Sequence, residues 1–120
     1  ENIMLERLEK EDITPTAPYN IYDELDLDRK LGDDILKALC AKKQVIRLQH
    51  NIFVHAISLN KIVKVMNEII KNEGFIEIKN FKEKFPISRK YLVTYLDYLD
   101  NFSQIKKVDN KRYLASNMNL

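Results

Sequence analysis

The chain has 120 residues, 45% of them hydrophobic and 32% charged, with a formal net charge of +2. Such a composition is typical of a folded globular chain and excludes a disordered one. No apolar run reaches the roughly 18 residues of a membrane span, and nothing resembles a signal peptide. We therefore expect a cytoplasmic chain without a membrane partner, and the initial Glu suggests a fragment of a longer protein.

The first half of the chain predicts helices followed by a hairpin. Residues 1–12 predict a short amphipathic helix, and the prolines at 15 and 18 then favour an extended connector. Residues 19–27 predict a short acidic helix. Two β-branched and aromatic runs, 44–49 and 52–56, flank the polar pair His50-Asn51 and predict a β-hairpin. Between these segments a third helix follows Asp28, with an expected inner face of Leu31, Ile35, Leu36, Leu39 and Cys40.

The same order recurs in the second half. Apolar positions over 60–73 predict the clearest helix of the chain, which Gly74 ends. A short strand at 75–78 follows, and then a short helix that Asn80 caps and Pro86 ends. Strands at 104–108 and 111–115 around the pair Asp109-Asn110 predict a second hairpin. The polar tail from Ser116 is expected to fray.

The helix before this second hairpin spans 88–100, with Ser88 at the N-cap and Leu92, Tyr95, Leu96 and Leu99 on one apolar face. Its first turn holds Arg89 and Lys90, although a helix N-terminus carries partial positive charge and favours Asp or Glu there. Cations beside free backbone N–H groups form a suitable receptor for phosphate. The start of this helix therefore predicts an anionic ligand.

Three helices and a hairpin are the order of a winged-helix unit, and the sequence predicts that order twice. The expected fold class is mainly α with small β-hairpins (α+β), in two tandem winged-helix domains. We place these domains at residues 1–57 and 58–120. Each is small enough to have a marginal core.

The chain offers little for catalysis. With only two glycines, Gly32 and Gly74, it cannot form a Gly-rich phosphate loop. His50 and His55 lack a carboxylate-rich context, so we interpret them as a turn residue and a satisfied strand-end residue. Cys40, the one cysteine, can form neither an internal disulfide nor a Cys-rich zinc site, and is expected to fill the core. We predict no catalytic residue, no metal and no cofactor in this chain.

The charge distribution predicts a polyanionic partner for the second half. Residues 1–60 carry 8 Lys and Arg against 11 Asp and Glu, whereas residues 61–120 carry 12 against 7. The predicted wing adds four cations to the basic helix start, so that the two form one candidate basic surface. These cations are Lys106, Lys107, Lys111 and Arg112. The alternative is a solvated basic face without a ligand.

Two further observations refine this surface. Tyr91 lies beside the basic helix start and is a candidate to stack on an exposed base, whereas Tyr95 is expected in the core. The first domain lacks the basic pattern, because its wing, Gln49-His50-Asn51, is almost uncharged. We therefore interpret the first domain as a spacer or packing unit and the second as the nucleic-acid-binding unit.

Several of these segments resemble the C-terminal end of the SelB family, the bacterial selenocysteine-specific translation elongation factors. In that family the C-terminal region is a string of winged-helix domains, and the last one binds the selenocysteine insertion hairpin in messenger RNA. The resemblance is carried by Phe53-Val54-His55-Ala56, Phe81, Ser88-Arg89-Lys90-Tyr91, Leu96-Asp97-Tyr98-Leu99-Asp100, and the closing run 106–114.

The resemblance implies RNA contacts at the helix start and the wing, namely at Ser88, Arg89, Lys90, Lys106, Lys107, Lys111 and Arg112. It also implies that GTP hydrolysis, selenocysteinyl-tRNA binding and contact with the ribosome belong to a parent protein, of which this piece is a monomeric fragment.

The sequence departs from the family at three places. Lys106-Lys107 stands where the wing usually has Arg-Arg, which keeps the charge but removes bidentate donors. Asp109-Asn110 replaces the usual Gly of the wing turn, and Asn101-Phe102-Ser103 stands where the family tends to carry Arg-Ile-Gly.

The resulting hypothesis is a grip on an RNA stem-loop, with phosphates held by the helix start and wing and an unpaired base read near Arg89 and Tyr91. Four to six phosphate contacts would give a log–log salt slope of roughly −3 to −5. Two alternatives remain at this point. A tandem winged-helix DNA regulator would place the same helix in a major groove, although the first domain lacks a basic surface. A protein-interaction scaffold would not need the cations at all.

Overall fold

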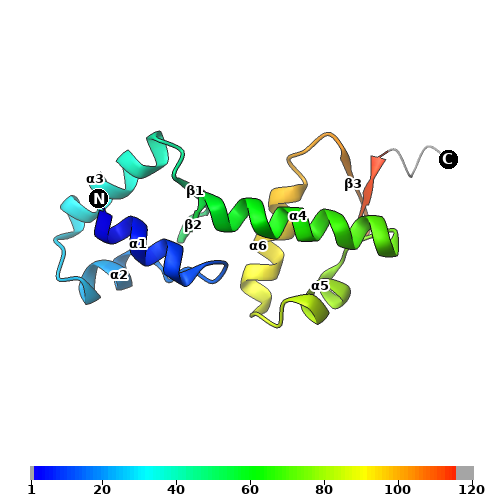
Figure 1. The fold of residues 1–120 in the computed structure, drawn as a ribbon, viewed down its shortest axis with the longest axis horizontal. Helices are drawn as coiled ribbons and strands as arrows, with labels where there is room; N and C mark the ends of the chain where they lie inside the picture. Colours follow the sequence, from blue (N-terminus) through cyan, green and yellow to red (C-terminus); the bar gives the residue numbers. More distant parts are fainter. Residues whose placement is uncertain (1, 116–120) are drawn as a thin grey trace. The chain divides into compact units, whose positions relative to one another are not determined.

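The computed structural model describes residues 2–115, within which six helices and two β-hairpins follow one another (Figure 1). The predicted frayed tail from Ser116 lies outside the described residues. The chain divides into two compact units, Glu1–Asn60 and Lys61–Leu120. Helix α4 (Ala56–Glu73) begins directly after the first hairpin, four residues before the predicted start, because residues 56–60 contain no Gly or Pro.

The first unit contains α1 (Asn2–Glu11), α2 (Pro18–Glu24), α3 (Arg29–Ala41) and a hairpin of β1 (Val45–Gln49) and β2 (Ile52–His55). The two strands pair antiparallel, with Val45 opposite His55. The hydrophobic core gathers side chains from all three helices and from β1: Met4, Leu8, Ile21, Tyr22, Leu36, Leu39 and Val45. The helices and the hairpin are those that the sequence predicts.

One prediction for α3 is wrong. Leu31 was expected on its inner face, but this side chain is 50% exposed. The buried stripe instead runs through Gly32, Leu36 and Leu39, which are spaced by four and three residues. Gly32 belongs to the stripe because α3 lies directly against Tyr22: a Cβ atom at Gly32 would lie 2.6 Å from a ring carbon of Tyr22.

The second unit is built from the remainder of α4 with α5 (Ile78–Lys84), α6 (Arg89–Leu99) and a hairpin of β3 (Ile105–Val108) and β4 (Lys111–Leu114). Gly74 ends α4 with a φ of +91°, the left-handed conformation that favours glycine at this position. The buried apolar side chains include the whole predicted face of α6. They are Ile62, Met66, Ile69, Ile70, Ile76, Phe81, Leu92, Tyr95, Leu96, Leu99 and Ile105.

The predicted strand at 75–78 is wrong in its length. Only Ile76 pairs with the hairpin, through two 2.9 Å backbone hydrogen bonds to Arg112 on β4. Ile78 already begins α5, and Glu77 rather than Asn80 takes the N-cap position. The Asn80 side chain accepts a hydrogen bond from the Glu77 N–H (2.8 Å) and donates one to the Phe75 carbonyl (2.9 Å). This buried amide fixes the turn that connects the bridge to α5.

Candidate nucleic-acid interface

The N-terminal turn of α6 is exposed and basic, as predicted. Ser88 is the N-cap, and its carbonyl accepts hydrogen bonds from the N–H groups of Tyr91 (3.1 Å) and Leu92 (3.2 Å). Its hydroxyl makes no capping hydrogen bond. Arg89 and Lys90 are exposed, and the Lys90 ammonium lies 4.7 Å from the centroid of the Tyr91 ring. The aromatic ring and the cation therefore form one unit at the start of the helix.

The strand register distributes the wing cations over both faces of the hairpin. Lys107 lies opposite Arg112, and Lys106 lies opposite Tyr113. Because successive side chains of a strand point to opposite faces, Lys106 and Lys107 are separated by the hairpin itself. Lys111 shares the face of Lys106.

An aromatic contact confirms this division. The Lys111 ammonium lies 4.4 Å from the centroid of the Phe75 ring, and Phe75 in turn lies 6.1 Å from the ring of Tyr113. Lys111 is thus held over an aromatic pair on the side of the hairpin that carries Lys106. The sequence predicted one surface for all four wing cations, whereas the register gives two.

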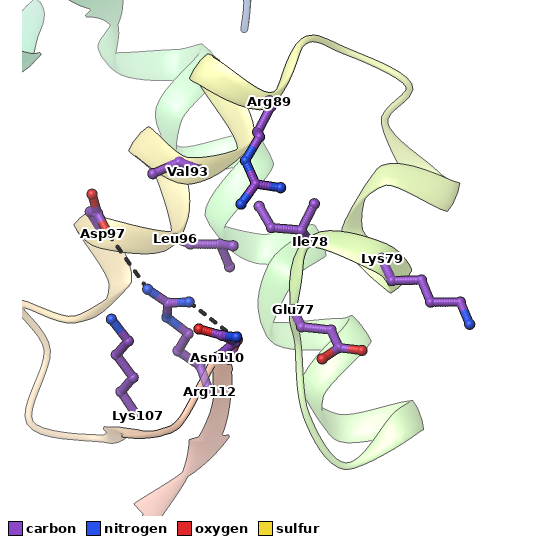
Figure 2. Close-up of a pocket in the computed structure, with 10 residues that line it drawn as sticks. All are labelled: Glu77, Ile78, Lys79, Arg89, Val93, Leu96, Asp97, Lys107, Asn110 and Arg112. Atoms are coloured by element: carbon purple, nitrogen blue, oxygen red, sulfur yellow. Dashed lines mark hydrogen bonds and ion pairs between the residues drawn. The ribbon is translucent and has the colours of Figure 1, made fainter.

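A pocket of about 490 Å³ lies between α5, α6 and the hairpin on the Lys107 side (Figure 2). Its apolar part comes from Ile78, Val93 and Leu96. Figure 2 shows Arg89 extending from α6 toward Ile78, so that its guanidinium lies over this apolar part. Lys107 lines the pocket from the hairpin. The pocket therefore combines an apolar base with cations contributed from two separate elements.

Arg112 does not occupy the position that the sequence suggested for it. It is only 6% exposed, and its guanidinium donates hydrogen bonds to both carboxylate oxygens of Asp100, from Nε at 3.1 Å and from Nη2 at 3.0 Å. A second carboxylate, that of Asp97, lies 3.5 Å from Nη2. A direct RNA contact at Arg112 stays a prediction, but the structure buries this guanidinium and directs most of its N–H donors at protein oxygens.

Sequence reasoning did not assign several residues to this pocket: Leu96 was expected only on the apolar face of its helix, and Ile78, Lys79 and Val93 were not considered as site residues. Ile78, Val93 and Leu96 supply its apolar part, and Lys79 lies at its edge with an ammonium that Figure 2 shows extending away from the other side chains. No sequence signal distinguished Lys79 from the neighbouring lysines of α5. The sequence did carry a signal for Val93, because this apolar residue lies outside the stripe that α6 buries. The structure leaves its side chain 36% exposed.

The interpretation of both histidines is confirmed. The Nδ1 atom of His55 accepts a hydrogen bond from the Ile57 N–H at 3.1 Å, and His50 lies in the turn, where its Nδ1 is 3.0 Å from a guanidinium nitrogen of Arg47. Cys40 is partly buried, and this burial raises the pKa of its thiol. Within residues 2–115 no group of His, Cys, Asp and Glu side chains is arranged to hold a metal ion.

No helix in the described part of the chain is both long and apolar enough to cross a membrane.

The first unit has a hollow in the corresponding place, about 770 Å³ in volume, between α2, α3 and its hairpin. Its lining includes Tyr19, Asp33, Lys37, Cys40 and Arg47. This hollow has two aromatic rings, Tyr19 and Phe53, and one acid among two cations. The lining of the pocket in the second unit has no aromatic ring and has four basic side chains against two acidic ones. The interpretation of the first unit as a spacer stays a prediction.

The arrangement of elements and the basic helix–wing surface define a winged-helix protein. In comparisons with known proteins, residues 68–114 match the sequence model described as elongation factor SelB, winged helix. The solved mRNA-binding domain of elongation factor SelB from E. coli, in complex with SECIS RNA, has the same fold. Its TM-score is 0.74 at 12% sequence identity, over 82% of this chain and 81% of that chain. No curated protein sequence matches the chain. The resemblance to the C-terminal winged-helix region of the SelB family is thereby confirmed.

Proposed function

We propose that the second unit binds a hairpin RNA, as the last winged helix of a selenocysteine-specific elongation factor does. The observation that carries this proposal is the pocket between Arg89 and Lys107, in which an apolar base is lined by more basic than acidic side chains. The basic ones are Lys79, Arg89, Lys107 and Arg112, and the acidic ones are Glu77 and Asp97. The SelB match over residues 68–114 and the RNA in the neighbouring structure support the same ligand.

The geometry suits an unpaired base flanked by phosphates. The major groove of A-form RNA is too narrow for side chains to read, so proteins recognise bases that are splayed out of the stem. A pocket of about 490 Å³ falls within the range of small-ligand sites, about 300–1,000 Å³. The base would lie on Ile78 and Val93 beneath the Arg89 guanidinium, while Lys107 and the exposed first turn of α6 hold the phosphates on either side.

The proposed contact set is smaller than the sequence suggested. It comprises Ser88, Arg89, Lys90, Tyr91 and Lys107, which lie at the start of α6 or on the pocket side of the hairpin. The remaining wing cations are placed outside it, because Lys106 and Lys111 face the other way and Arg112 is buried. With Arg89 over the base, Lys90 and Lys107 on phosphates give a log–log salt slope of about −2, shallower than the roughly −3 to −5 expected from the full set.

The test is a titration of three labelled ligands followed by fluorescence anisotropy. They are a SECIS hairpin, the same hairpin with its unpaired bases removed, and a DNA duplex of equal length. We expect the first to bind most tightly, the second to bind more weakly and the duplex weakest. Preference for the duplex would favour the DNA-regulator alternative, and a salt slope near zero would remove the electrostatic part of the proposal.

A protein-interaction scaffold makes a different prediction. It expects that the double substitution Arg89→Ala with Lys90→Ala leaves partner binding unchanged and that no RNA is retained at moderate salt. The RNA proposal expects the same variant to lose most of its RNA binding. In this proposal GTP hydrolysis belongs to a cytoplasmic parent protein, which also binds the selenocysteinyl-tRNA and the ribosome. The fragment itself is monomeric and uses no cofactor.

A further inference from the structure

Arg112 makes more interactions than any other cation of the wing. Besides the two hydrogen bonds to Asp100 and the 3.5 Å contact with Asp97, its Nη1 donates to the Asn110 carbonyl at 3.4 Å. Its backbone forms the two hydrogen bonds to Ile76. One buried residue thus connects α6, the turn of the hairpin and the bridge that precedes α5, which are the three sides of the pocket.

The carboxylates of Asp97 and Asp100 are unfavourable near an RNA surface, because they carry the same charge as the phosphates. Asp97 lines the same pocket as Arg89 and Lys107, and its side chain is 48% exposed. Asp100 follows three residues later, so both acids lie on the face of α6 that meets the hairpin. Without a cation between them they would repel a phosphate at this site.

We infer that Arg112 is a positioning residue of the RNA surface: it fastens the wing to α6 and offsets the negative charge of Asp97 and Asp100. Among the residues that line the pocket, Glu77 is then the carboxylate left to oppose Lys79, Arg89 and Lys107. This inference rests on the proposed function. A fork of two hydrogen bonds to one carboxylate is a geometry that Arg provides and Lys does not. The residue acts through its neighbours and does not itself contact the RNA.

The experiment is a mutant cycle on RNA-hairpin affinity. In the wild-type background, Arg112→Met leaves two carboxylates without their cation, and we expect affinity to fall at least about tenfold. In the Asp97→Asn, Asp100→Asn background the same Met substitution has no charge left to expose, and we expect a loss of less than about threefold. A direct phosphate contact predicts an equal loss in both backgrounds, and that result would overturn the inference.

A conservative substitution gives a second, independent measurement. Arg112→Lys keeps the charge but loses the fork, so we expect it to recover less than half of the affinity that Met loses. Near-complete recovery would mean that the charge alone is sufficient and would contradict the fastening of the wing by the fork. Glu68→Gln, an exposed carboxylate on α4 away from the pocket, is the matched control for the Asp substitutions and is expected to leave affinity unchanged.

The fastening is also measurable in the free protein, without RNA. Amide hydrogen exchange at Ile76 and Arg112 reports the two bridge hydrogen bonds directly. We expect Arg112→Lys to accelerate exchange at both amides at least about tenfold while Glu68→Gln does not. Unchanged exchange would refute the fastening. If wild-type protein failed to bind any RNA hairpin, the proposed function would fall, whereas the exchange result would still decide whether Arg112 holds the wing.

Discussion

Lys107→Gln should weaken binding of an RNA hairpin about fivefold at 150 mM salt, whereas the adjacent Lys106→Gln should change it less than about twofold. The two lysines are both exposed and occupy neighbouring positions on β3. They differ in the face they occupy, because Lys107 lines the pocket opposite Arg112 and Lys106 lies opposite Tyr113. Each therefore serves as the control for the other.

The magnitude follows from counterion release. One phosphate contact on a helical polyanion releases about 0.9 of a counterion, which at 150 mM salt corresponds to about 1 kcal/mol, or about fivefold in affinity. The assay is fluorescence anisotropy with a labelled hairpin at four salt concentrations between 50 and 300 mM. Lys107→Gln should lower the magnitude of the log–log slope by about 0.9, and Lys106→Gln should leave it unchanged. A larger effect for Lys106 than for Lys107 would refute the assignment of faces.

Three further predictions concern the stability of the scaffold. Gly32→Ala should destabilise the first unit by about 1–3 kcal/mol in urea unfolding, because the new methyl group meets the Tyr22 ring, although alanine in an open helix position would gain up to about 1 kcal/mol. Glu11 should contribute acid sensitivity: burial would raise the pKa of its carboxyl, but hydrogen bonds from Thr16 and Arg7 hold it below its ordinary value. Its stabilisation is therefore present above the ordinary pKa of 4.5 and is lost as the pH falls through the lower folded value, so Glu11→Gln should shrink the difference in unfolding free energy between pH 7 and pH 3. Asn80→Ala should cost about 1–3 kcal/mol in thermal unfolding, since two backbone groups lose their partner, and a cost near zero would mean that water replaces the amide.

Local periodicity was sufficient to predict the helices, both hairpins and the winged-helix order. The stripe Leu92, Tyr95, Leu96 and Leu99 is buried as its spacing required, and Gly74 ends its helix in the left-handed conformation. The error at Leu31 has a physical cause, since Gly32 took its place on the inner face to accommodate a tyrosine from another helix. A glycine inside a helical pattern was the available signal, but its partner could not be read from the sequence.

The exposed cations at the start of α6 were predictable from the sequence, whereas the faces and the burial of the wing cations were predicted less well. The turn at Asp109-Asn110 was predicted correctly, and the alternation of a strand would already have separated Lys106 from Lys107. The burial of Arg112 was beyond sequence reasoning, because it depends on carboxylates twelve and fifteen residues earlier on a different element. Charge counts treat every cation alike, whereas packing decides which of them remain available to a ligand.

Because β4 is paired on both sides, β3 lies at the edge of the small sheet. Arg112 bridges to Ile76 on one side of β4 and pairs with β3 on the other. Within residues 2–115, β3 (Ile-Lys-Lys-Val) has a strand partner on one side only and forms the edge of this small sheet. Exposed edges recruit further strands from other molecules, and lysines on a short edge strand prevent this. We therefore expect the two lysines to oppose edge-to-edge association of the hairpin. Replacing both by apolar or β-branched residues would turn the wing into a self-associating edge, and loss of RNA binding in such a variant would report aggregation rather than recognition.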